Sequence, residues 1–349
     1  MFLFVDISSH GFGHLSITAP VLRALAARVP KLRLTVRSLL PQTQLRQRIG
    51  FDFEHLPVAT DFGFVMHDAL RVDLEASAAR YRQAEAEHER RLASEAALLR
   101  QMAPDLVLSN ISDLPLAGAA EAGIPAAALC SLNWADLFRH CYGDADWAQP
   151  IHARLLAAYR SARMFLRTTP GMAMPDLANL VPVGPIAQPG RRIGLGLPSG
   201  ERAIVLAMGG IAMRLPVEDW PRLPGIRWLV PQAWNCGHPD AIAQEFFGLP
   251  FPDLLASADA VVTKPGYGTF TEAACNGTPV LYQRRPTWLE QDVLIAWLEE
   301  HWNCGEVDGD TLQAGRLGAA LERLWSQPAK PRPLANGDRE AAAHLMTLA

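Results

Sequence analysis

The first residues that could carry chemistry form the run HGFGH at residues 10–14, between an apolar, strand-like stretch and a helix expected at about residues 16–29. Its glycines allow a tight turn and expose backbone amides at the start of that helix, where an anion or a polar substrate can dock. The positive end of the helix disfavours protonation of His14, and a neutral imidazole can take a proton from a hydroxyl. The run therefore predicts a general base at His14 and a ligand-facing turn at Gly13. An ordinary strand–helix turn, with His14 as a capping or packing residue, explains the pattern equally well.

The run KPGYGTFTE, which begins at Lys264 and ends at Glu272, is the most specific candidate site. The bare amides of Gly266 and Gly268, the helix dipole and Lys264 together predict a seat for a pyrophosphate. Glu272 can accept hydrogen bonds from two vicinal ribose hydroxyls. Thr269 and Glu272 also have the spacing of a capping box, with Thr269 as the N-cap. These two roles compete for one carboxylate.

Two weaker candidates follow other strand-like runs. Gly209 and Gly210 lack the GxGxxG pattern of a dinucleotide site, yet they can let a diphosphate approach the backbone. An ordinary turn is the simpler interpretation of this pair. Further along the chain, Arg285 can pair with a phosphate, while Glu290 and Gln291 can bind sugar hydroxyls. The alternative there is a solvated loop and the start of a helix.

The composition excludes several classes of protein. A chain of 349 residues, 49% hydrophobic and 19% charged, predicts two domains with real cores and excludes disorder. A formal net charge of −4 does not favour nucleic acid or an anionic membrane as a partner. No apolar stretch suits a membrane span, and the N-terminus lacks the basic region of a signal peptide. The cysteine usage predicts a cytoplasmic protein. Five scattered cysteines without CxxC spacing indicate reduced thiols rather than a metal site.

Apolar runs of strand length alternate with helical patterns, which predicts an α/β fold of two facing, doubly wound, Rossmann-like domains with parallel sheets. A ligand is expected in the cleft between them. The predicted divisions are a first domain at residues 1–167, a linker at 168–200, a second domain at 201–327, and a final helix at 338–348 that packs back on the first domain.

The first domain contains an interruption of this alternation. Residues 57–73 form a long loop that carries Asp61, His67 and Asp68, and loops of that length are lids, binding loops or disordered segments. Residues 75–102 are rich in Ala, Glu and Arg, and we expect one long exposed helix there.

Together these runs resemble the GT-B glycosyltransferases, whose second domain holds most of a nucleotide-sugar donor. The order HGFGH, KPGYGTFTEA, TPVLY and an EQ pair carries this resemblance. It extends more distantly to the peptidoglycan N-acetylglucosaminyltransferase and to UDP-glycosyltransferases. A closer likeness, over most of residues 1–325, is to the glycosyltransferase-like N-terminal region of L-arabinokinase. DALRVD at 68–73 and the RR pair at 284–285 add to that likeness.

The resemblance implies roles for individual residues. His14 is similar in position to the catalytic base of these enzymes, and Asp113 is a candidate partner that orients it. Glu272 corresponds to the carboxylate that holds the donor ribose. Gly268 and Thr269 correspond to the turn that faces the donor phosphates.

Further donor contacts are implied at Gln291, for the sugar, and at Phe251, beside the base. Plant-type enzymes usually carry a His where this chain has Lys264, so the recognition of phosphate must differ. Acceptor sites in this superfamily lie on loops of the first domain, which here are residues 57–73 and 133–149.

The leading hypothesis is a transferase that moves a sugar from a nucleoside diphosphate donor, of the UDP type, to an unidentified acceptor hydroxyl with inversion. His14 would remove the hydroxyl proton, and the donor-side amides with Lys264 or an arginine would stabilise the leaving diphosphate. This scheme requires no metal and no other cofactor. Two alternatives stay open: a nucleotide-sugar epimerase or hydrolase that uses Glu290 or His67, and a nucleotide-sugar binding module that has lost transfer.

Overall fold

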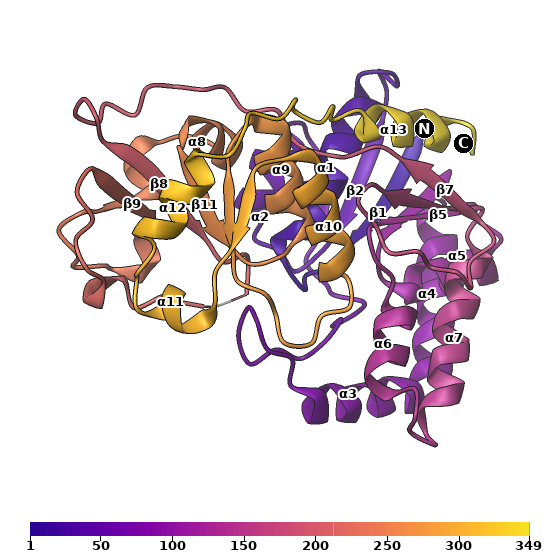
Figure 1. Ribbon diagram of the computed structural model, residues 1–349. Coiled ribbons are helices and arrows are strands. Elements are labelled where there is room, and N and C mark those ends of the chain that lie inside the picture. The colour runs from indigo at the N-terminus through magenta and orange to yellow at the C-terminus, as the bar shows by residue number, and fades with distance from the viewer. Residues whose placement is uncertain (212, 349) are drawn as a thin grey trace.

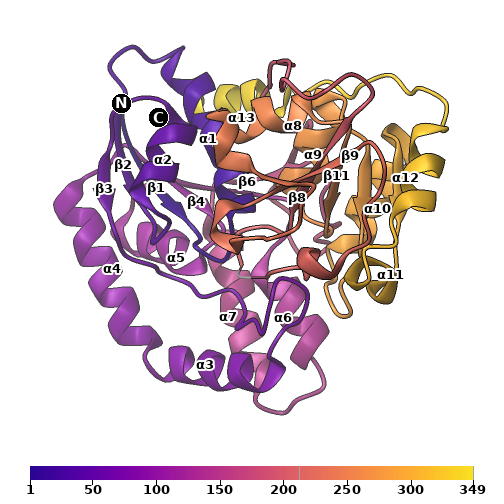
Figure 2. The same cartoon turned by 90° about the vertical axis from the view of Figure 1, so that its left-hand side faces the viewer.

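The computed structural model describes residues 1–211 and 213–348. Two β-sheets organise the chain, one of seven strands and one of six, and helices lie on both faces of each sheet (Figures 1 and 2). Neighbouring strands in both sheets run parallel. The predicted α/β fold of two doubly wound halves is therefore confirmed.

The first sheet has the strand order β3-β2-β1-β4-β5-β6-β7. Its strands are β1 (Phe2–Ile7), β2 (Arg33–Arg37), β3 (Glu54–Leu56), β4 (Leu106–Asn110), β5 (Ala126–Cys130), β6 (Met164–Thr168) and β7 (Leu180–Val183). The helices of this half are α1 (Phe12–Ala26), α2 (Gln42–Ile49), α3 (Leu74–Ala86), α4 (His88–Met102), α5 (Asp113–Ala122), α6 (Trp134–Tyr142) and α7 (Ala148–Ser161).

The second sheet has the order β10-β9-β8-β11-β12-β13. Its strands are β8 (Arg202–Ala207), β9 (Ile226–Val230), β10 (Ala241–Ala243), β11 (Ala260–Thr263), β12 (Val280–Tyr282) and β13 (Cys304–Glu306). The helices of this half are α8 (Phe251–Ser257), α9 (Tyr267–Asn276), α10 (Gln291–His301), α11 (Gly309–Gln313) and α12 (Gly318–Trp325), with short 3₁₀ turns at Val217–Asp219, Gln232–Trp234 and Gln244–Phe247.

Each sheet reverses its strand order once. The chain moves outward from β1 to β3 and returns to place β4 on the other side of β1, and the second half repeats this with β8, β10 and β11. Ligands of doubly wound sheets bind beyond the carboxyl ends of the strands at such a reversal. The turns that follow β1, β4, β8 and β11 are therefore the segments that the fold brings together at a binding position.

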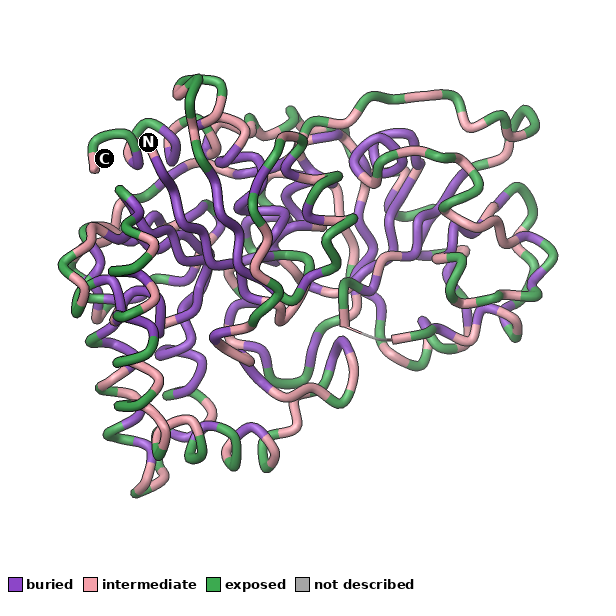
Figure 3. Tube along the Cα trace, turned by 180° about the vertical axis from the view of Figure 1, so that it is seen from behind, coloured by how far each residue is buried: buried purple, intermediate pink, exposed green. Residues whose placement is uncertain are grey.

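The core of each half lies along its strands (Figure 3). All six residues of β1 are buried, because helices cover both faces of a parallel sheet. One of them is Asp6, whose carboxylate accepts hydrogen bonds from Arg37 Nε at 2.6 Å, Ser112 Oγ at 2.7 Å and Thr60 Oγ1 at 2.9 Å. Arg37 also pairs with the buried Glu95 of α4. A buried charge needs such partners, and this network holds the loop after β3 and the turn before α5 against β1.

Three local expectations were wrong. Helix α1 begins at Phe12, with Gly11 as its N-cap, and not near residue 16. The segment 75–102 forms two helices, α3 and α4, which meet at Glu87 and run in different directions (Figure 2). It is also not exposed on all sides, because Tyr81 and Leu99 are buried against the first core. Finally, β7 lies within the predicted linker, where its sequence LVPV tolerates a proline because β7 is an edge strand.

The last helix, α13 (Gly337–Met346), lies against α1 and β7. Arg28 Nη1 donates to the carbonyl of Arg339 at 2.9 Å, and the carboxylate of Glu340 accepts the Gly184 amide at 2.7 Å. Both ends of the chain therefore lie on the first half (Figure 1).

Candidate active site

Two helix starts, one from each half, meet at the junction between the halves. A methyl group on Gly268, at the start of α9, would overlap Ser16 Oγ of α1. A methyl group on Gly210, after β8, would lie 2.8 Å from the ring of Phe12. These glycines are needed for the close approach of the halves, and the junction brings the turn after β1 next to the turns after β8 and β11.

His14 lies on the first turn of α1 and is buried. Its Nδ1 atom lies 2.9 Å from Oδ1 of Asn110, the last residue of β4. In the described part of the chain, its Nε2 atom makes no hydrogen bond, so this nitrogen is available to a ligand. Burial lowers the pKa of His14 to about 4, although the Asn110 hydrogen bond acts in the opposite direction. A neutral imidazole at pH 7 is the form that a general base requires.

Asp113 is not the partner of His14. Its carboxylate pairs with Arg154 of α7 at 2.5 Å, at the start of α5. Asn110 takes the position beside His14 because β4 ends directly alongside β1, where Ile7 and Asn110 are register partners. Sequence reasoning missed Asn110, although a polar residue at the carboxyl end of a buried strand is the signal that identifies it.

Two cationic side chains of the second half lie at this junction and form no ion pair within 4 Å in the described residues, although the carboxylate of Glu290 is near both of them. Lys264 is half-buried overall, and its Nζ atom makes only a 3.5 Å hydrogen bond to the Pro265 carbonyl within the described residues. Burial of the ammonium group and the nearby Arg285 lower the pKa of Lys264 to about 7. Arg285 is 5% exposed, and its Nε and Nη2 atoms have no hydrogen-bond partner among the described residues. Buried charged donors without partners indicate a site for an anion.

Gly209 and aromatic side chains surround these cations. Gly209 has a φ of 91°, which a residue with a Cβ rarely adopts, and it lies beside the Lys264 side chain. The Arg285 guanidinium lies 3.8 Å from the centre of the Trp288 ring, on which His10 stacks at 5.7 Å. Burial and the neighbouring imidazole of His14 lower the pKa of His10 to about 3, and its Nε2 atom has no partner in the described chain.

Glu272 is engaged by a residue that sequence reasoning missed. Its carboxylate accepts hydrogen bonds from Arg48 of α2, at 2.6 and 3.2 Å. Glu272 is 1% exposed, and Arg48 also donates to the Gln188 side chain at 3.1 Å. The Arg48 guanidinium lies 6.0 Å from the ring of Phe251, which begins α8. The carboxylate expected to hold a ribose therefore forms an ion pair between the halves in this structure.

The predicted capping box is absent. Helix α9 begins at Tyr267, with Gly266 as its N-cap and no side-chain cap bond. Thr269 is therefore the third residue of the helix and cannot be its N-cap. The interpretation failed because a glycine can occupy the N-cap position itself, which moves the helix start toward the N-terminus.

Glu290 and Gln291 form hydrogen bonds with residues that line the site. The carboxylate of Glu290 accepts hydrogen bonds from Ser131 of the first half at 2.5 Å and from Trp288 Nε1 at 3.1 Å. The Gln291 side chain accepts from the Arg285 amide at 2.9 Å and donates to the Arg285 carbonyl at 2.8 Å. Both predicted sugar-binding side chains are thus hydrogen-bonded within the protein, and Gln291 fixes the backbone of Arg285.

The loop after β3 crosses to the second half. Its residues 66–72, which we name the hairpin, pair antiparallel at Met66 and Val72. The hairpin tip is buried at Ala69 and Leu70, in the hydrophobic cluster of the second sheet that includes Met208. Figure 1 shows this segment, between β3 and α3, reaching under the second half. The loop therefore belongs to the first half in sequence but packs on the core of the second half.

The second loop expected to bind an acceptor, residues 133–149, is mostly helix α6. Trp134 of α6 is fully buried, and its Nε1 donates to Asp61 at 2.7 Å. Burial and the nearby Asp6 raise the pKa of Asp61 to about 7. Asn133 caps the helix by accepting the Asp136 amide at 2.8 Å. These contacts pack the start of the segment into the first core, whereas the polar side chains of Arg139, His140, Asp144 and Asp146 further along are exposed.

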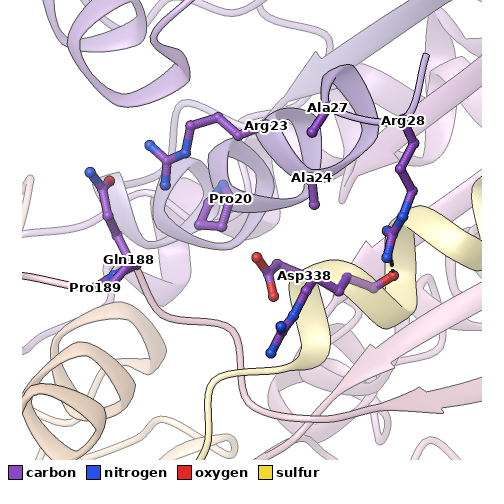
Figure 4. Close-up of a pocket in the computed structure, with 9 residues that line it drawn as sticks. Pro20, Arg23, Ala24, Ala27, Arg28, Gln188, Pro189 and Asp338 are labelled. Atoms are coloured by element: carbon purple, nitrogen blue, oxygen red, sulfur yellow. Dashed lines mark hydrogen bonds between the residues drawn. The ribbon is translucent and has the colours of Figure 1, made fainter.

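A hollow of about 600 Å³ lies between α1, the connection at Gln188 and the start of α13 (Figure 4). Arg23, Arg28 and Asp338 are among its lining residues, and none of the predicted site residues line it. Across residues 1–211 and 213–348, no three His, Cys, Asp or Glu side chains lie together as metal ligands would. Over the same residues, the helices are too short or too polar to span a bilayer.

Two facing Rossmann-like halves define the class of fold called GT-B, which this chain has. A solved glycosyltransferase of kitacinnamycin has a TM-score of 0.66 and 17% identity, over 99% of this chain and 95% of that one. VinC, a glycosyltransferase solved with dTDP, has a TM-score of 0.57 and 18% identity, over 100% and 95% of the chains. A protein described as a UDP-N-acetylglucosamine 2-epimerase from Listeria monocytogenes has a TM-score of 0.59 and 13% identity, over 99% and 94%.

L-Arabinokinase from Arabidopsis thaliana is 26% identical over 369 aligned residues, which include 97% of this chain. The similarity falls in the N-terminal part of that protein, and the chain spans 33% of its length. No protein-family model matches the chain. The comparisons thus show a GT-B fold, and the solved proteins of similar fold are mostly glycosyltransferases.

Proposed function

We propose that this chain is a glycosyltransferase that moves a sugar from a nucleoside diphosphate sugar, of the UDP type, to an acceptor hydroxyl with inversion. One observation carries the proposal: a neutral base, His14, lies on one side of the junction, and two basic side chains that form no close ion pair in the described residues, Lys264 and Arg285, lie on the other. Glycosyl transfer needs both features, because a hydroxyl loses a proton while a diphosphate leaves with negative charge.

In this reaction the acceptor oxygen forms a bond to the anomeric carbon as the bond from that carbon to the phosphate oxygen breaks. The electron pair of the broken bond leaves with the diphosphate, and the hydroxyl proton moves to His14 Nε2. Lys264 and Arg285 receive the diphosphate, whose oxygens accept the hydrogen bonds that Arg285 Nε and Nη2 do not make within the described protein. Their burial strengthens this attraction, because the local dielectric is lower than that of water.

The other donor contacts belong to the same proposal. The donor phosphates face the glycine-containing turns of both halves and the first turn of α9, which are Gly13, Gly209, Gly210, Gly266, Gly268 and Thr269. Phe251 lies beside the nucleotide base. Gln291 acts by holding the backbone of Arg285 in place, and Glu290 acts by holding the Trp288 side chain. Glu272 holds the ribose only after its ion pair with Arg48 opens. Entry of the donor therefore requires side chains at the junction to move. No cofactor besides the donor is part of the proposal.

The test follows the release of UDP from UDP-sugars, with and without a panel of small-molecule acceptors. We expect UDP release that depends on an acceptor, and we expect His14→Ala to lower this turnover by about 10²- to 10⁴-fold. The affinity for UDP should change by no more than about twofold, because His14 acts on the acceptor proton. His301→Ala, which changes a half-exposed histidine of α10, is the matched control. Unchanged turnover in His14→Ala would show that His14 is not the general base.

An epimerase is the second candidate, because one solved protein of similar fold is described as a nucleotide-sugar 2-epimerase. The residues considered for this chemistry are placed unfavourably: both carboxylate oxygens of Glu290 are hydrogen-bonded, and His67 is exposed on the hairpin near Asp73. Incubation with UDP-N-acetylglucosamine alone separates the possibilities. An epimerase or hydrolase converts this compound without an acceptor, and a transferase converts it only when an acceptor is present. A binding module does not convert it under either condition.

A further inference from the structure

The partner of His14 is an amide in a position with no access to solvent. Asn110 is fully buried at the end of β4, as is Thr18, one turn along α1 from His14. Buried polar atoms in a folded protein have hydrogen-bond partners, so the orientation of the Asn110 side chain follows from counting donors and acceptors.

Thr18 fixes which end of the amide faces His14. The Thr18 hydroxyl donates its single proton to the carbonyl oxygen of His14 at 2.8 Å. It can therefore only accept from Asn110, whose Nδ2 lies 2.8 Å from Thr18 Oγ1 and 3.3 Å from the same carbonyl. With the amide nitrogen held there, the oxygen Oδ1 is the atom that faces His14 Nδ1, at 2.9 Å.

An amide oxygen can accept a hydrogen bond but cannot donate one, so the proton of this contact belongs to His14 Nδ1. We infer that Asn110 is a positioning residue that holds His14 as the Nδ1–H tautomer and directs the lone pair of Nε2 to the acceptor hydroxyl. This inference rests on the proposed function, since it assigns the atom of His14 that takes the proton.

The remaining groups around His14 add no negative charge to the pair. Cys130 of β5 has its sulfur 3.9 Å from His14 Nδ1, and burial raises the pKa of this thiol to about 12. Trp134 of α6 presents its ring to His14 at 5.8 Å. His10 of the preceding turn is neutral at pH 7, and the charged groups that act on His10 from the second half are the cations Arg285 and Lys264.

A neutral partner and a carboxylate have different consequences for a base. A carboxylate beside Nδ1 would stabilise the imidazolium that forms when Nε2 takes a proton, whereas an amide sets the tautomer and leaves the imidazolium without a counter-charge. Burial lowers the pKa of His14 to about 4, and the Asn110 hydrogen bond offsets only part of this effect, so the proton that His14 accepts is readily passed on.

The test is a ¹⁵N NMR titration of the histidine rings in the ligand-free protein, with the His14 signals assigned by their loss in His14→Gln. We expect His14 at pH 7 to carry its proton on Nδ1, with Nε2 unprotonated and a midpoint well below that of an exposed histidine. Asn110→Asp should raise this midpoint by roughly 1–3 pH units. Asn110→Ala should yield a mixture of the two neutral tautomers.

A proton on Nε2 in the wild-type protein, or no response of the tautomer ratio to Asn110→Ala, would overturn the inference. The His14 ring signals can also be assigned in the wild-type protein through its backbone resonances, so the tautomer is tested even where a buried substitution prevents folding. The spectrum is also independent of turnover. Loss of the proposed function with an Nδ1–H tautomer intact, and a wrong tautomer in an active transferase, are therefore distinguishable results.

Discussion

The two sides of the junction differ in how their polar groups are satisfied. On the first half, His14, Asn110 and Thr18 form a closed, neutral set of hydrogen bonds that leaves only Nε2 of His14 available. On the second half, Lys264 and Arg285 are basic groups that form no ion pair within 4 Å in the described chain, and the buried Nε and Nη2 atoms of Arg285 make no hydrogen bond there. A neutral set is stable without a ligand, whereas buried unpaired cations destabilise the empty protein. The difference indicates that the second half binds an anionic ligand and that the first half carries out a proton transfer.

The largest effect that sharpens this comparison is the pH dependence of diphosphate binding. The free Lys264 has a pKa of about 7, and a bound diphosphate favours its charged form, so binding takes up a proton above that pH. The affinity for UDP should therefore fall as pH rises, by up to about tenfold per unit between pH 7 and 9. Isothermal titration calorimetry across this range measures the fall. Lys264→Met should bind UDP weakly and without this slope, and an equal slope in that variant would contradict the assignment.

A smaller effect is expected where the halves interact directly. Arg48 occupies the carboxylate of Glu272, so a ribose that uses Glu272 must displace it. Arg48→Gln should tighten UDP binding by roughly 3- to 10-fold, because a larger fraction of the protein is then competent to bind. The gain should vanish in the double variant with Glu272→Ala. Arg46→Gln changes the exposed arginine two residues away and serves as the control. Equal or weaker binding by Arg48→Gln would show that Glu272 does not contact the ribose.

The smallest effect concerns the hairpin that joins the first half to the second core. Leu70 is 8% exposed within that core, so Leu70→Ala should lower the free energy of unfolding by about 2 kcal/mol and Tm by a few degrees. Leu39→Ala, at a leucine that is 58% exposed, is the matched control and should change Tm by less than about 1 °C. Thermal unfolding followed by circular dichroism compares the two. An unchanged Tm in Leu70→Ala would mean that the hairpin does not hold the halves together.

The fold was predictable from the sequence because its signals are local. Buried parallel strands such as β1 and β11 are short apolar runs, and each is followed by a glycine-containing turn and a helix. Boundaries were less predictable. Gly11 and Gly266 serve as N-caps without a side-chain bond, so α1 and α9 begin earlier than serine, threonine and aspartate signals suggest.

The site was predictable only in part. The turns that form it are continuous in sequence, whereas the hydrogen-bond and ion-pair partners of its side chains lie far away along the chain. The positions of Lys264 and Arg285 after buried strands identified them as candidate phosphate ligands, although their lack of partners is visible only in three dimensions. The pairing of Glu272 with Arg48 joins residues 224 positions apart and leaves no trace in the sequence spacing. The choice between Asp113 and Asn110 depended on the register of β4 beside β1, which the sequence pattern does not specify.

The central claim is that the unpartnered cations of the second half bind the diphosphate of a sugar donor. The most direct measurement compares UDP binding by the wild-type protein, Arg285→Ala and Arg284→Ala. Arg284 is the adjacent arginine, and it is exposed and paired with Asp292 and Glu306. We predict that Arg285→Ala weakens binding by about 10- to 100-fold, as expected for a lost charge-assisted hydrogen bond, while Arg284→Ala changes it by no more than about twofold. Equal affinities in all three proteins, or no UDP binding by the wild type, would contradict the account.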